Sequence, residues 1–244
     1  MKYQSPEGEI EALRNVSLEI LEGEFISIVG PSGCGKSTLL NIIAGLIEPS
    51  DGEILINNKI VKKPTGMVGY MPQRDQLFEW RSIWKNVVLG LEIQDKVNDT
   101  TAAFAHKLLK DYGLEEFKYK FPNQLSGGMR QRVALIRTLA INPEILLLDE
   151  AFSALDYQTR LVVTDEVKEI IRKENKTAIL VTHDLSEAIS MADRVVVLTQ
   201  RPGTVKNIHN IRLTCDIHTP LGCREAPEFK DYFNKIWREL DVRV

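Results

Sequence analysis

A glycine-rich turn between a strand-like segment and a helical one is the feature that most constrains how this chain folds. Residues 30–38 read GPSGCGKST and fit the pattern G-x-x-x-x-G-K-[ST]. The residues before it, 24–29, have the character of a strand, and residues 37–44 have the apolar spacing of a helix. In such a unit the backbone N–H groups and the positive end of the helix hold a phosphate. We therefore expect an α/β fold built around a phosphate-binding turn, rather than an ordinary glycine turn before a helix.

The residue types of this turn fit a nucleoside triphosphate such as ATP. The glycines let the backbone approach the phosphates, Lys36 supplies a point charge for the β- and γ-phosphates, and the Ser37 hydroxyl is expected to coordinate Mg²⁺. We also expect an accessible thiol at Cys34, without requiring a chemical role for it. The residues expected to contact the nucleotide here are Gly30, Pro31, Ser32, Gly33, Cys34, Gly35, Lys36, Ser37 and Thr38.

Two carboxylates follow the apolar segment 145–148. At the end of a buried strand Asp149 would approach the metal, and Glu150 would polarise the attacking water. A strand that ends in Asp-Glu is by itself often only a solvated turn. Together with the glycine-rich turn, it indicates nucleotide hydrolysis.

Strand-sized apolar segments alternate with helical ones over the second half of the chain, which predicts a mostly parallel sheet covered on both faces. The segments are 145–148, 158–174, 177–181, 186–191 and 194–198.

This alternation is interrupted between residues 73 and 139, where 84–91 and 102–112 have helical character. We expect an inserted α-helical subdomain there. Segments 17–20 and 53–56 alternate polar and apolar residues and predict a small antiparallel sheet that flanks the main one.

The 244 residues are expected to form one domain, 1–244, with the helical subdomain at about 76–139 and a short C-terminal tail at 205–244. Within the tail, a stripe of apolar residues after Pro227 predicts a helix docked on the core, with a partner-binding helix as the alternative. Cys215, His218 and Cys223 are three candidate metal ligands without a helix-spaced pair.

Charge and hydropathy exclude several classes of protein. With 31 Lys and Arg against 34 Asp and Glu, the net charge is −3, which leaves no basic footprint for a nucleic acid partner. The longest apolar stretches are strand-sized, so we expect no membrane crossing. The three cysteines show no paired metal spacing, and the N-terminus lacks an apolar signal segment, which together predict a cytosolic protein.

A second candidate anion site lies at Ser126, Gly127 and Gly128, directly before a predicted helix at about 129–140. One nucleotide does not need two such turns from the same chain. A head-to-tail homodimer would use both, with each nucleotide held by the Lys36 turn of one subunit and the Ser126 turn of the other. The alternative is a glycine-rich helix cap with no ligand.

Together these motifs resemble those of the ATP-binding subunits of ABC transporters, over essentially the whole chain. Residues 70–73 resemble the family's Q-loop, 125–131 its signature motif, 153–156 its D-loop and 182–184 its switch histidine, all in the family's order. The resemblance implies a P-loop NTPase core with a flanking antiparallel β-subdomain and an inserted α-helical subdomain.

The resemblance also implies residue roles. Gln73 would contact Mg²⁺ or the attacking water, Ser126 and Gly128 the γ-phosphate across the dimer, and His183 the γ-phosphate and the water of Glu150. Taken singly, Gln73 could equally be a surface polar residue, Asp156 a helix N-cap and His183 a hydrogen-bonding residue at a strand end. Tyr3 resembles the aromatic residue that stacks on adenine, but it lies so near the start of the chain that we expect it to be poorly anchored, or the true start to lie upstream.

Residues 73–87 and 201–203 resemble the nitrate, sulfonate and taurine importer branch, although Glu79 departs from the proline frequent there. This implies an ATPase on the cytoplasmic face of the membrane that drives uptake of a small anion or related metabolite. Its partners would be a separate permease and, indirectly, a solute-binding protein. Among the residues after Gln73, some are expected to line a groove for a permease helix, with core packing as the alternative for the two tryptophans: Leu77, Phe78, Trp80 and Trp84.

Two other functions use the same motifs. One is the lone ATPase subunit of an ABC exporter. The other is a soluble ABC-type mechanical ATPase, in which a long coiled coil or a second ATPase head is usual, and the sequence contains neither.

Overall fold

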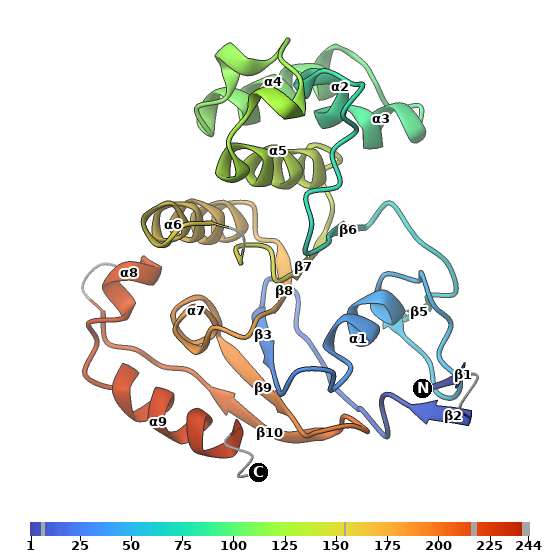
Figure 1. Cartoon of the computed structure of the whole chain (residues 1–244), viewed down its shortest axis with the longest axis vertical. Coiled ribbons are helices and arrows are strands. Elements are labelled where there is room, and N and C mark those ends of the chain that lie inside the picture. Colours follow the sequence, from blue (N-terminus) through green and yellow to red (C-terminus); the bar gives the residue numbers. More distant parts are fainter. Residues whose placement is uncertain (6–7, 154, 216–218, 241–244) are drawn as a thin grey trace.

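A central six-stranded sheet organises the molecule. The computed structural model describes residues 1–5, 8–153, 155–215 and 219–240, and its sheet has the strand order β10-β9-β3-β8-β7-β6 (Figure 1). All neighbouring strands are parallel except β9 and β10. This confirms the predicted mostly parallel sheet. The strands are β3 Phe25–Val29, β6 Val68–Met71, β7 Ile145–Asp149, β8 Thr177–Val181, β9 Arg194–Leu198 and β10 Val205–Asn210.

Both faces of the sheet are buried, as the apolar strands require. Successive side chains point to opposite faces, so Ile26 and Ile28 of β3 contact helix α1 (Lys36–Ile43), whereas Phe25 and Val29 belong to the core on the other face. Full burial of each such side chain stabilises the fold by about 1.5–3 kcal/mol. The helices of that second face are α6 Tyr157–Lys173, α7 Leu185–Met191, α8 Pro220–Cys223 and α9 Phe229–Leu240.

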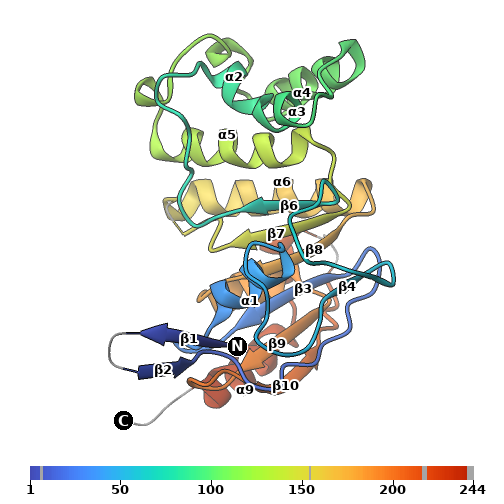
Figure 2. The ribbon, with the colours of Figure 1, turned by 90° about the vertical axis from the view of Figure 1, so that its right-hand side faces the viewer.

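A helical body lies between β6 and β7 in the chain and forms the upper part of the molecule (Figures 1 and 2). The predicted helix at 84–91 is two helices, because Val88 both ends α2 and begins α3. Gly90 lets α3 approach the end of α5 closely, since a Cβ there would lie 2.5 Å from the Ile141 side chain. The helices of this body are α2 Ile83–Val87, α3 Leu89–Ile93, α4 Asp99–Asp111 and α5 Gly127–Ala140, with 3₁₀ turns at Glu115–Phe117 and Pro122–Gln124.

The antiparallel strands flank the main sheet, but the segment pairing expected from sequence is wrong. Residues 17–20 form no strand, although Leu18 and Ile20 are half-buried against the core around α1. Their alternation arises from packing without a hydrogen-bonded neighbour. The short antiparallel pairs are instead β1 Lys2–Ser5 with β2 Gly8–Glu11, and β4 Leu55–Ile56 with β5 Lys59–Ile60.

The C-terminal part closes one side of the sheet. Strand β10 pairs antiparallel with β9, and α9 packs on α7 and β9, as expected of a docked helix. Ile236 is completely buried, and Trp237 remains exposed. Of the three candidate metal ligands in this tail, His218 lies outside the described residues. The described part of the chain, which includes Cys215 and Cys223, contains no cluster suited to a metal.

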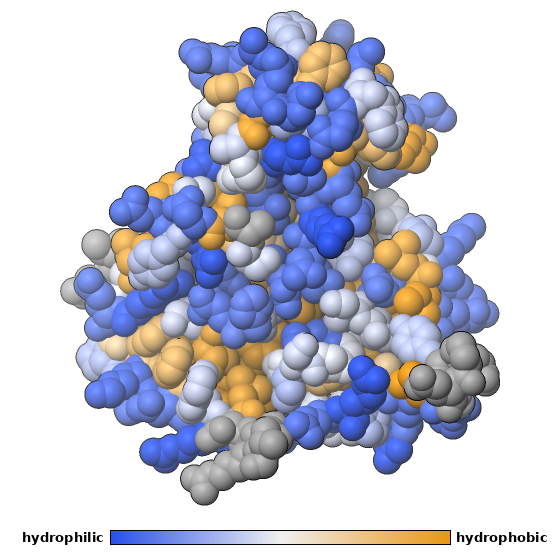
Figure 3. Space-filling view, in the orientation of Figure 1, coloured by the Kyte–Doolittle hydropathy of each residue, from blue (hydrophilic) through white to orange (hydrophobic). Residues whose placement is uncertain are grey.

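Hydrophilic side chains cover most of the face seen in Figure 3, and the outline narrows between the helical body and the rest of the molecule. Among the residues placed by the structure, none of the helices is both long and apolar enough to span a bilayer.

Candidate functional site

The candidate residues gather where the parallel strands end. Strands β3, β8, β7 and β6 are neighbours, so their carboxyl ends lie along one edge of the sheet. The turn 30–35 follows β3, Thr182 and His183 follow β8, Glu150 follows β7 and Gln73 closely follows β6. This edge is where open α/β sheets bind their ligands.

The glycine-rich turn has the backbone conformation that its sequence predicts. Gly33 and Gly35 adopt φ values of 74° and 103°, which L side chains rarely adopt. Lys36 begins α1 and is 8% exposed, and its Nζ donates to the carbonyl oxygens of Gly30 at 2.8 Å and Pro31 at 3.1 Å. The lysine charge is therefore held over the turn, with the N–H groups of α1 beside it.

Cys34 does not present the accessible thiol that we expected. It is 1% exposed and packs in the core between α1 and the sheet, because its side chain turns away from the open side of the loop. Burial raises the pKa of this thiol, and the nearby Lys36 charge partly offsets the effect. Cys34 therefore supports the turn by packing into the core between α1 and the sheet.

Residues 201–203, whose sequence resembles the importer branch, also support the turn. A Cβ on Gly203 would overlap the carbonyl of Cys34, and Gly203 donates its N–H to the carbonyl of Ala12 at 2.9 Å. Arg201 donates from Nε to the carbonyl of Gly33 at 3.2 Å. No local pattern predicts these contacts, since they join positions far apart in the chain.

Asp149 and Ser37 lie together at the start of α1. The Ser37 hydroxyl donates to Asp149 Oδ1 at 3.2 Å, and the Tyr70 hydroxyl donates to Asp149 Oδ2 at 3.3 Å. Burial raises the pKa of Asp149, and the two hydrogen bonds partly offset the effect. No sequence motif indicated that Tyr70 would orient this carboxylate. A hydroxyl and a carboxylate at this separation, beside a phosphate-binding turn, are oxygen ligands of the kind that Mg²⁺ prefers.

Glu150 is held between two of the other predicted residues. Its Oε2 accepts a hydrogen bond from Gln73 Nε2 at 2.7 Å and lies 3.5 Å from His183 Nδ1. Glu150 adopts a left-handed φ of 47°, and its N–H donates to the carbonyl of Val181 at 2.8 Å. The structure therefore brings two side chains that are far apart in sequence, those of Gln73 and His183, to the Glu150 carboxylate.

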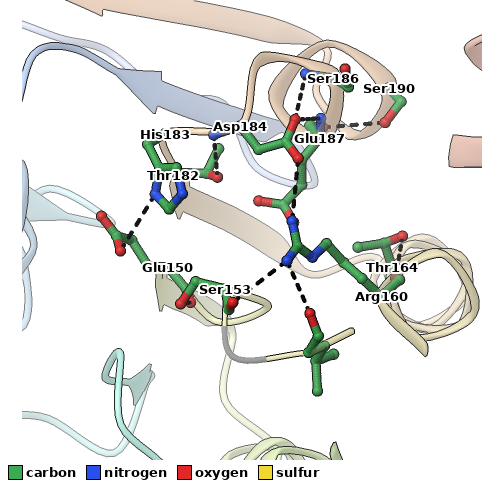
Figure 4. Close-up of polar contacts among 11 residues, drawn as sticks. Glu150, Ser153, Arg160, Thr164, Thr182, His183, Asp184, Ser186, Glu187 and Ser190 are labelled. Carbon is green, nitrogen blue, oxygen red and sulfur yellow. Dashed lines mark hydrogen bonds and ion pairs between the residues drawn. The ribbon is translucent and has the colours of Figure 1, made fainter. Parts of the chain in front are cut away.

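The segment after Glu150 is tied to the segment after His183 (Figure 4). Arg160 of α6 donates to the Leu155 carbonyl at 2.9 Å and lies 3.4 Å from Asp184 Oδ2. Asp184 caps α7, and Asp156 caps α6 by accepting from Thr159 N at 3.0 Å, so the N-cap interpretation of Asp156 is confirmed. Ala154, within the predicted D-loop, lies outside the described residues.

Glu187 is a buried carboxyl beside this network. It is 2% exposed, and burial raises its pKa to about 7, with the Thr182 hydroxyl bond acting in the opposite direction. A carboxyl in the first turn of a helix is usually exposed, so the sequence of α7 did not predict that Glu187 would be buried.

The Ser126 turn lies apart from these residues, in the helical body at the start of α5 (Figure 1). Ser126 is the N-cap and accepts from Met129 N at 3.3 Å. Gly128 approaches α6, where an added Cβ would lie 3.3 Å from Thr159, but a Cβ on Gly127 would meet no atom within 4 Å. No contact within the described part of the chain explains why residue 127 is a glycine.

The helix that begins at this turn is joined to the segment after Gln73. Arg130 Nε donates to Asp75 Oδ2 at 2.9 Å, and Arg130 Nη2 lies 2.8 Å from Glu79. Arg137, about two turns further along the same face of α5, donates to the carbonyls of Asp75 and Gln76. Although partial burial acts to raise it, the pKa of Asp75 is lowered by its bonds from Arg130 and the Leu77 N–H.

Tyr3 is better anchored than the sequence led us to expect. It lies in β1, opposite Ile10 of β2, and its hydroxyl donates to Thr38 Oγ1 at 3.3 Å. The β1–β2 hairpin therefore places this aromatic ring next to α1.

Comparison with known proteins agrees with this geometry. Residues 13–153 match the ABC transporter family of ATP-binding domains. The chain belongs to this family. It is 47% identical over 239 residues to the uncharacterized ABC transporter ATP-binding protein YtlC of Bacillus subtilis, an alignment that covers 98% of this chain and 92% of the relative. It is also 38% identical over 245 residues to the taurine import ATP-binding protein TauB of Roseobacter denitrificans, with 97% of this chain and 91% of the relative covered.

Solved structures of ABC transporter cassettes have the same fold. The dimeric structure of MJ0796, a bacterial ABC transporter cassette, aligns with a TM-score of 0.77 and 36% identity, over 86% of this chain and 95% of that one. A dimeric post-hydrolysis state of the same cassette, bound to ADP and Pi, aligns with a TM-score of 0.74. This ABC protein is therefore an ATP-binding subunit and an ATPase, with the P-loop NTPase fold that its motifs imply.

Proposed function

We propose that this chain is the ATP-hydrolysing subunit of an ABC importer for a small solute, a nitrate-, sulfonate- or taurine-like anion or a related metabolite. Two copies would act together on a separate membrane permease at the cytoplasmic face of the membrane, with a solute-binding protein as an indirect partner. The observation that carries the proposal is the division of the motifs between two bodies. Lys36, Asp149 and Glu150 share one edge of the sheet, whereas the Ser126 turn begins a helix of the other body. The taurine importer subunit among the relatives supports the solute class.

In this proposal the Lys36 turn binds the triphosphate, from Gly30 to Thr38, and Tyr3 stacks on the adenine. Lys36 already sits over the turn, and its hydrogen bonds to Gly30 and Pro31 would be exchanged for bonds to phosphate oxygens. Ser37 and Asp149 would hold Mg²⁺, with Gln73 close by. The ion would neutralise the charge that develops on the phosphates during transfer.

Glu150 is then the residue that orients and deprotonates the attacking water. Glu150 follows Asp149 directly at the end of β7, and the hydrogen bond from Gln73 together with the nearby His183 ring would hold its carboxylate at the same edge as the Lys36 turn. Gln73 and His183 therefore position the base, and His183 would also hold the γ-phosphate.

The nucleotide is expected to be shared by two chains. Gly127 has open space where a side chain would be, and the N–H groups at the start of α5, of which that of Met129 donates to Ser126 Oγ, are of the kind that bind an anion. We propose that the Ser126, Gly127 and Gly128 turn of one copy contacts the γ-phosphate bound to the other copy. The neighbouring solved structures are dimeric.

The permease is expected to dock where the segment after Gln73 reaches the surface. Phe78 and Trp80 are 36% and 76% exposed and stack on each other, with ring centroids 4.9 Å apart. Leu77 is buried and Trp84 is partly buried against the core, so core packing explains those two residues. Phe78 also forms part of a groove of about 560 Å³. The groove is lined by Asn41, Leu46, Tyr70, Pro72, Gln76, Phe78 and Arg137.

Co-expression with candidate permeases tests the assignment. We expect one permease to co-purify with the chain and the complex in membrane vesicles to accumulate a taurine-, sulfonate- or nitrate-type anion when ATP is supplied on the chain's side. The Phe78→Ala, Trp80→Ala double variant should lose the permease, whereas Trp237→Ala, which alters an exposed tryptophan elsewhere, should keep it. ATP-driven export by the complex would contradict the importer assignment, and ATPase activity with no membrane partner would contradict transport.

A further inference from the structure

The carboxylate of Asp149, which the proposed function assigns to Mg²⁺, accepts a hydrogen bond from a hydroxyl group at each of its two oxygens. Asp149 is 6% exposed. The Ser37 hydroxyl donates to its Oδ1 at 3.2 Å, and the Tyr70 hydroxyl donates to its Oδ2 at 3.3 Å. No further donor to either oxygen is found among the residues that the structure describes. Ser37 is itself proposed to hold the ion, whereas Tyr70 is not among the residues assigned to nucleotide binding or hydrolysis.

The pairing of β6 with β7 places Tyr70 beside this carboxylate. The two strands are parallel, Tyr70 lies opposite Leu147, and Asp149 follows two residues further along β7. Side chains two residues apart in a strand point to the same face of the sheet. For Leu147 and Tyr70 that face is the one covered by α1, where both pack in the same core. Tyr70 therefore reaches Asp149 from the neighbouring strand, on the face where Ser37 begins the helix.

Packing alone does not explain why residue 70 carries a hydroxyl group. The ring of Tyr70 is half-buried against the apolar core around α1, and a phenylalanine would fill the same space. A phenol is protonated at neutral pH, so it donates to an ionised carboxylate. Hydrogen bonds to an ionised group are stronger than those between neutral groups. The hydroxyl therefore restrains the orientation of the Asp149 carboxylate.

The orientation of this carboxylate matters because Mg²⁺ requires nearly ideal octahedral geometry. Without a partner at Oδ2, the carboxylate of Asp149 would rotate more freely about its Cβ–Cγ bond, and Oδ1 would spend less time beside Ser37. Removal of a group that orients a metal-binding residue typically lowers metal affinity or activity by roughly 10–100-fold. A change of this size is expected if the Tyr70 hydroxyl orients Asp149.

We propose that Tyr70 is a positioning residue for the Mg²⁺ site, whose hydroxyl holds Oδ2 of Asp149 and thereby keeps Oδ1 beside Ser37. The inference rests on the assignment of Ser37 and Asp149 to Mg²⁺ in the proposed function. It predicts that the Tyr70 hydroxyl raises the affinity of the site for the metal and does not contribute to the binding of nucleotide alone.

Titration with Mn²⁺ measures the metal affinity directly, because Mn²⁺ takes the same oxygen ligands as Mg²⁺ and its unbound form gives an electron paramagnetic resonance signal. The full chain with Glu150→Gln, which is expected to retain ATP, is first mixed with slightly less than one equivalent of ATP. The additional change Tyr70→Phe should raise the Mn²⁺ concentration at half-saturation by about tenfold. Binding of a labelled ATP analogue in EDTA should be unchanged, which also shows that the variant is folded.

Two further variants in the Glu150→Gln chain separate this inference from the proposed function. Tyr119→Phe makes the same chemical change at an exposed tyrosine of the helical body and should leave Mn²⁺ binding unchanged. Asp149→Asn removes the carboxylate charge and should weaken Mn²⁺ binding at least as much as Tyr70→Phe does. If Asp149→Asn has no effect, the assignment of Mg²⁺ in the proposed function is wrong, and the inference with it. If Asp149→Asn weakens Mn²⁺ binding and Tyr70→Phe does not, the proposed function stands and the inference is overturned.

ATPase kinetics of chains with an intact Glu150 separate positioning from packing. In Tyr70→Phe, the Mg²⁺ concentration that gives half-maximal activity should rise about tenfold, whereas kcat at saturating Mg²⁺ should stay within about twofold of the parent value. An equal loss of activity at every Mg²⁺ concentration, or a loss of ATP affinity without metal, would show that Tyr70 only supports the fold of the site and would contradict the proposal.

Discussion

Two helices of this molecule begin with glycine-rich turns, and the turns differ in how much of their surroundings the chain supplies. At the start of α1, Gly33 and Gly35 have positive φ, Lys36 bonds to two turn carbonyls, and Cys34 and Gly203 support the turn from behind. At the start of α5, Ser126 caps the helix, and among the described residues none outside the local helix backbone lies within 4 Å of a Cβ added at Gly127. The chain itself supplies the surroundings of the first turn, whereas the second turn is open, and in the proposed function it is half of a site that a second copy completes.

This difference between the two turns indicates how ATP binding would favour the pairing of two copies. In the proposed function the Lys36 turn binds nucleotide in a single copy, whereas the Ser126 turn contacts a phosphate only when a second copy approaches. A ligand that interacts better with the paired state shifts the population toward that state. The proposed function therefore predicts that ATP binding drives pairing of two copies and that hydrolysis releases them.

The largest effect is expected at Glu150, at the end of β7. Glu150→Gln should lower the rate of ATP hydrolysis by about 10²–10⁴-fold, because it removes the general base. Nucleotide binding should be retained, and light scattering with ATP should show a dimer. Glu144→Gln, at the opposite end of β7, should keep full activity. A Glu150→Gln variant that hydrolyses ATP at the parent rate would remove this residue from the mechanism.

Removing the charge of the first turn should be the next largest change. Lys36→Ala should weaken ATP binding by about 100-fold, since charge-assisted bonds to phosphate are lost from a site that is otherwise preformed. Fluorescence titration with a labelled ATP analogue measures this, with the exposed Lys62→Ala as control. Undiminished affinity would contradict the role of the turn.

Glu187, which is buried beside Thr182 and so close to His183, predicts that the free energy of unfolding depends on pH. The pKa of Glu187 rises from 4.5 to about 7 on folding, so the native state binds this proton more tightly than the unfolded state does. The free energy of unfolding should therefore fall as the pH rises from about 4.5 to 7, by roughly 3 kcal/mol from this group.

Urea unfolding of Glu187→Gln isolates this contribution. The variant should gain stability relative to the parent chain across that pH window and be most favoured above pH 7. The exposed Glu22→Gln should follow the parent curve. A difference between variant and parent that does not change with pH would rule out the raised pKa.

The smallest effect is expected at Gly127 in the Ser126 turn. A substitution there should raise the stability of the separate chain and lower its ATPase activity. Gly127→Ala should stabilise the separate chain by up to about 1 kcal/mol, because alanine is a better helix former and meets no atom there. ATPase activity should fall about tenfold, since the methyl group would stand between the turn and the γ-phosphate. Asp99→Ala, at the first position of α4, is the matched control and should keep activity. Full activity in Gly127→Ala would mean that nothing approaches this glycine.

The sequence predicted the elements whose patterns are long and local. Strands β3, β7, β8 and β9 and helices α5 and α6 were expected near their observed positions because their apolar periodicity is strong. Strand β6 was missed, since it is short and contains Gly69. Residues 17–20 have the correct alternation but no strand partner, which no local pattern reveals.

The same distinction holds at the site. The motifs located Lys36, Asp149 and Glu150 because their spacing follows from the chain's own strands and turns. Tyr70 and Arg160 were missed as partners of site residues, because their contacts span many residues and depend on which strands are neighbours. Only the three-dimensional arrangement could show that Gly127 faces open space.

Complementation between two inactive variants tests most directly whether two chains share each nucleotide. Lys36→Ala and Gly127→Asp would be purified separately and mixed, and ATP hydrolysis by the mixture compared with that of each variant alone. The shared site predicts recovered activity well above the sum of the two, because a mixed dimer contains one site with an intact Lys36 turn and an intact Ser126 turn. A mixture no more active than that sum, although the two variants are shown to form mixed dimers, would contradict the shared site.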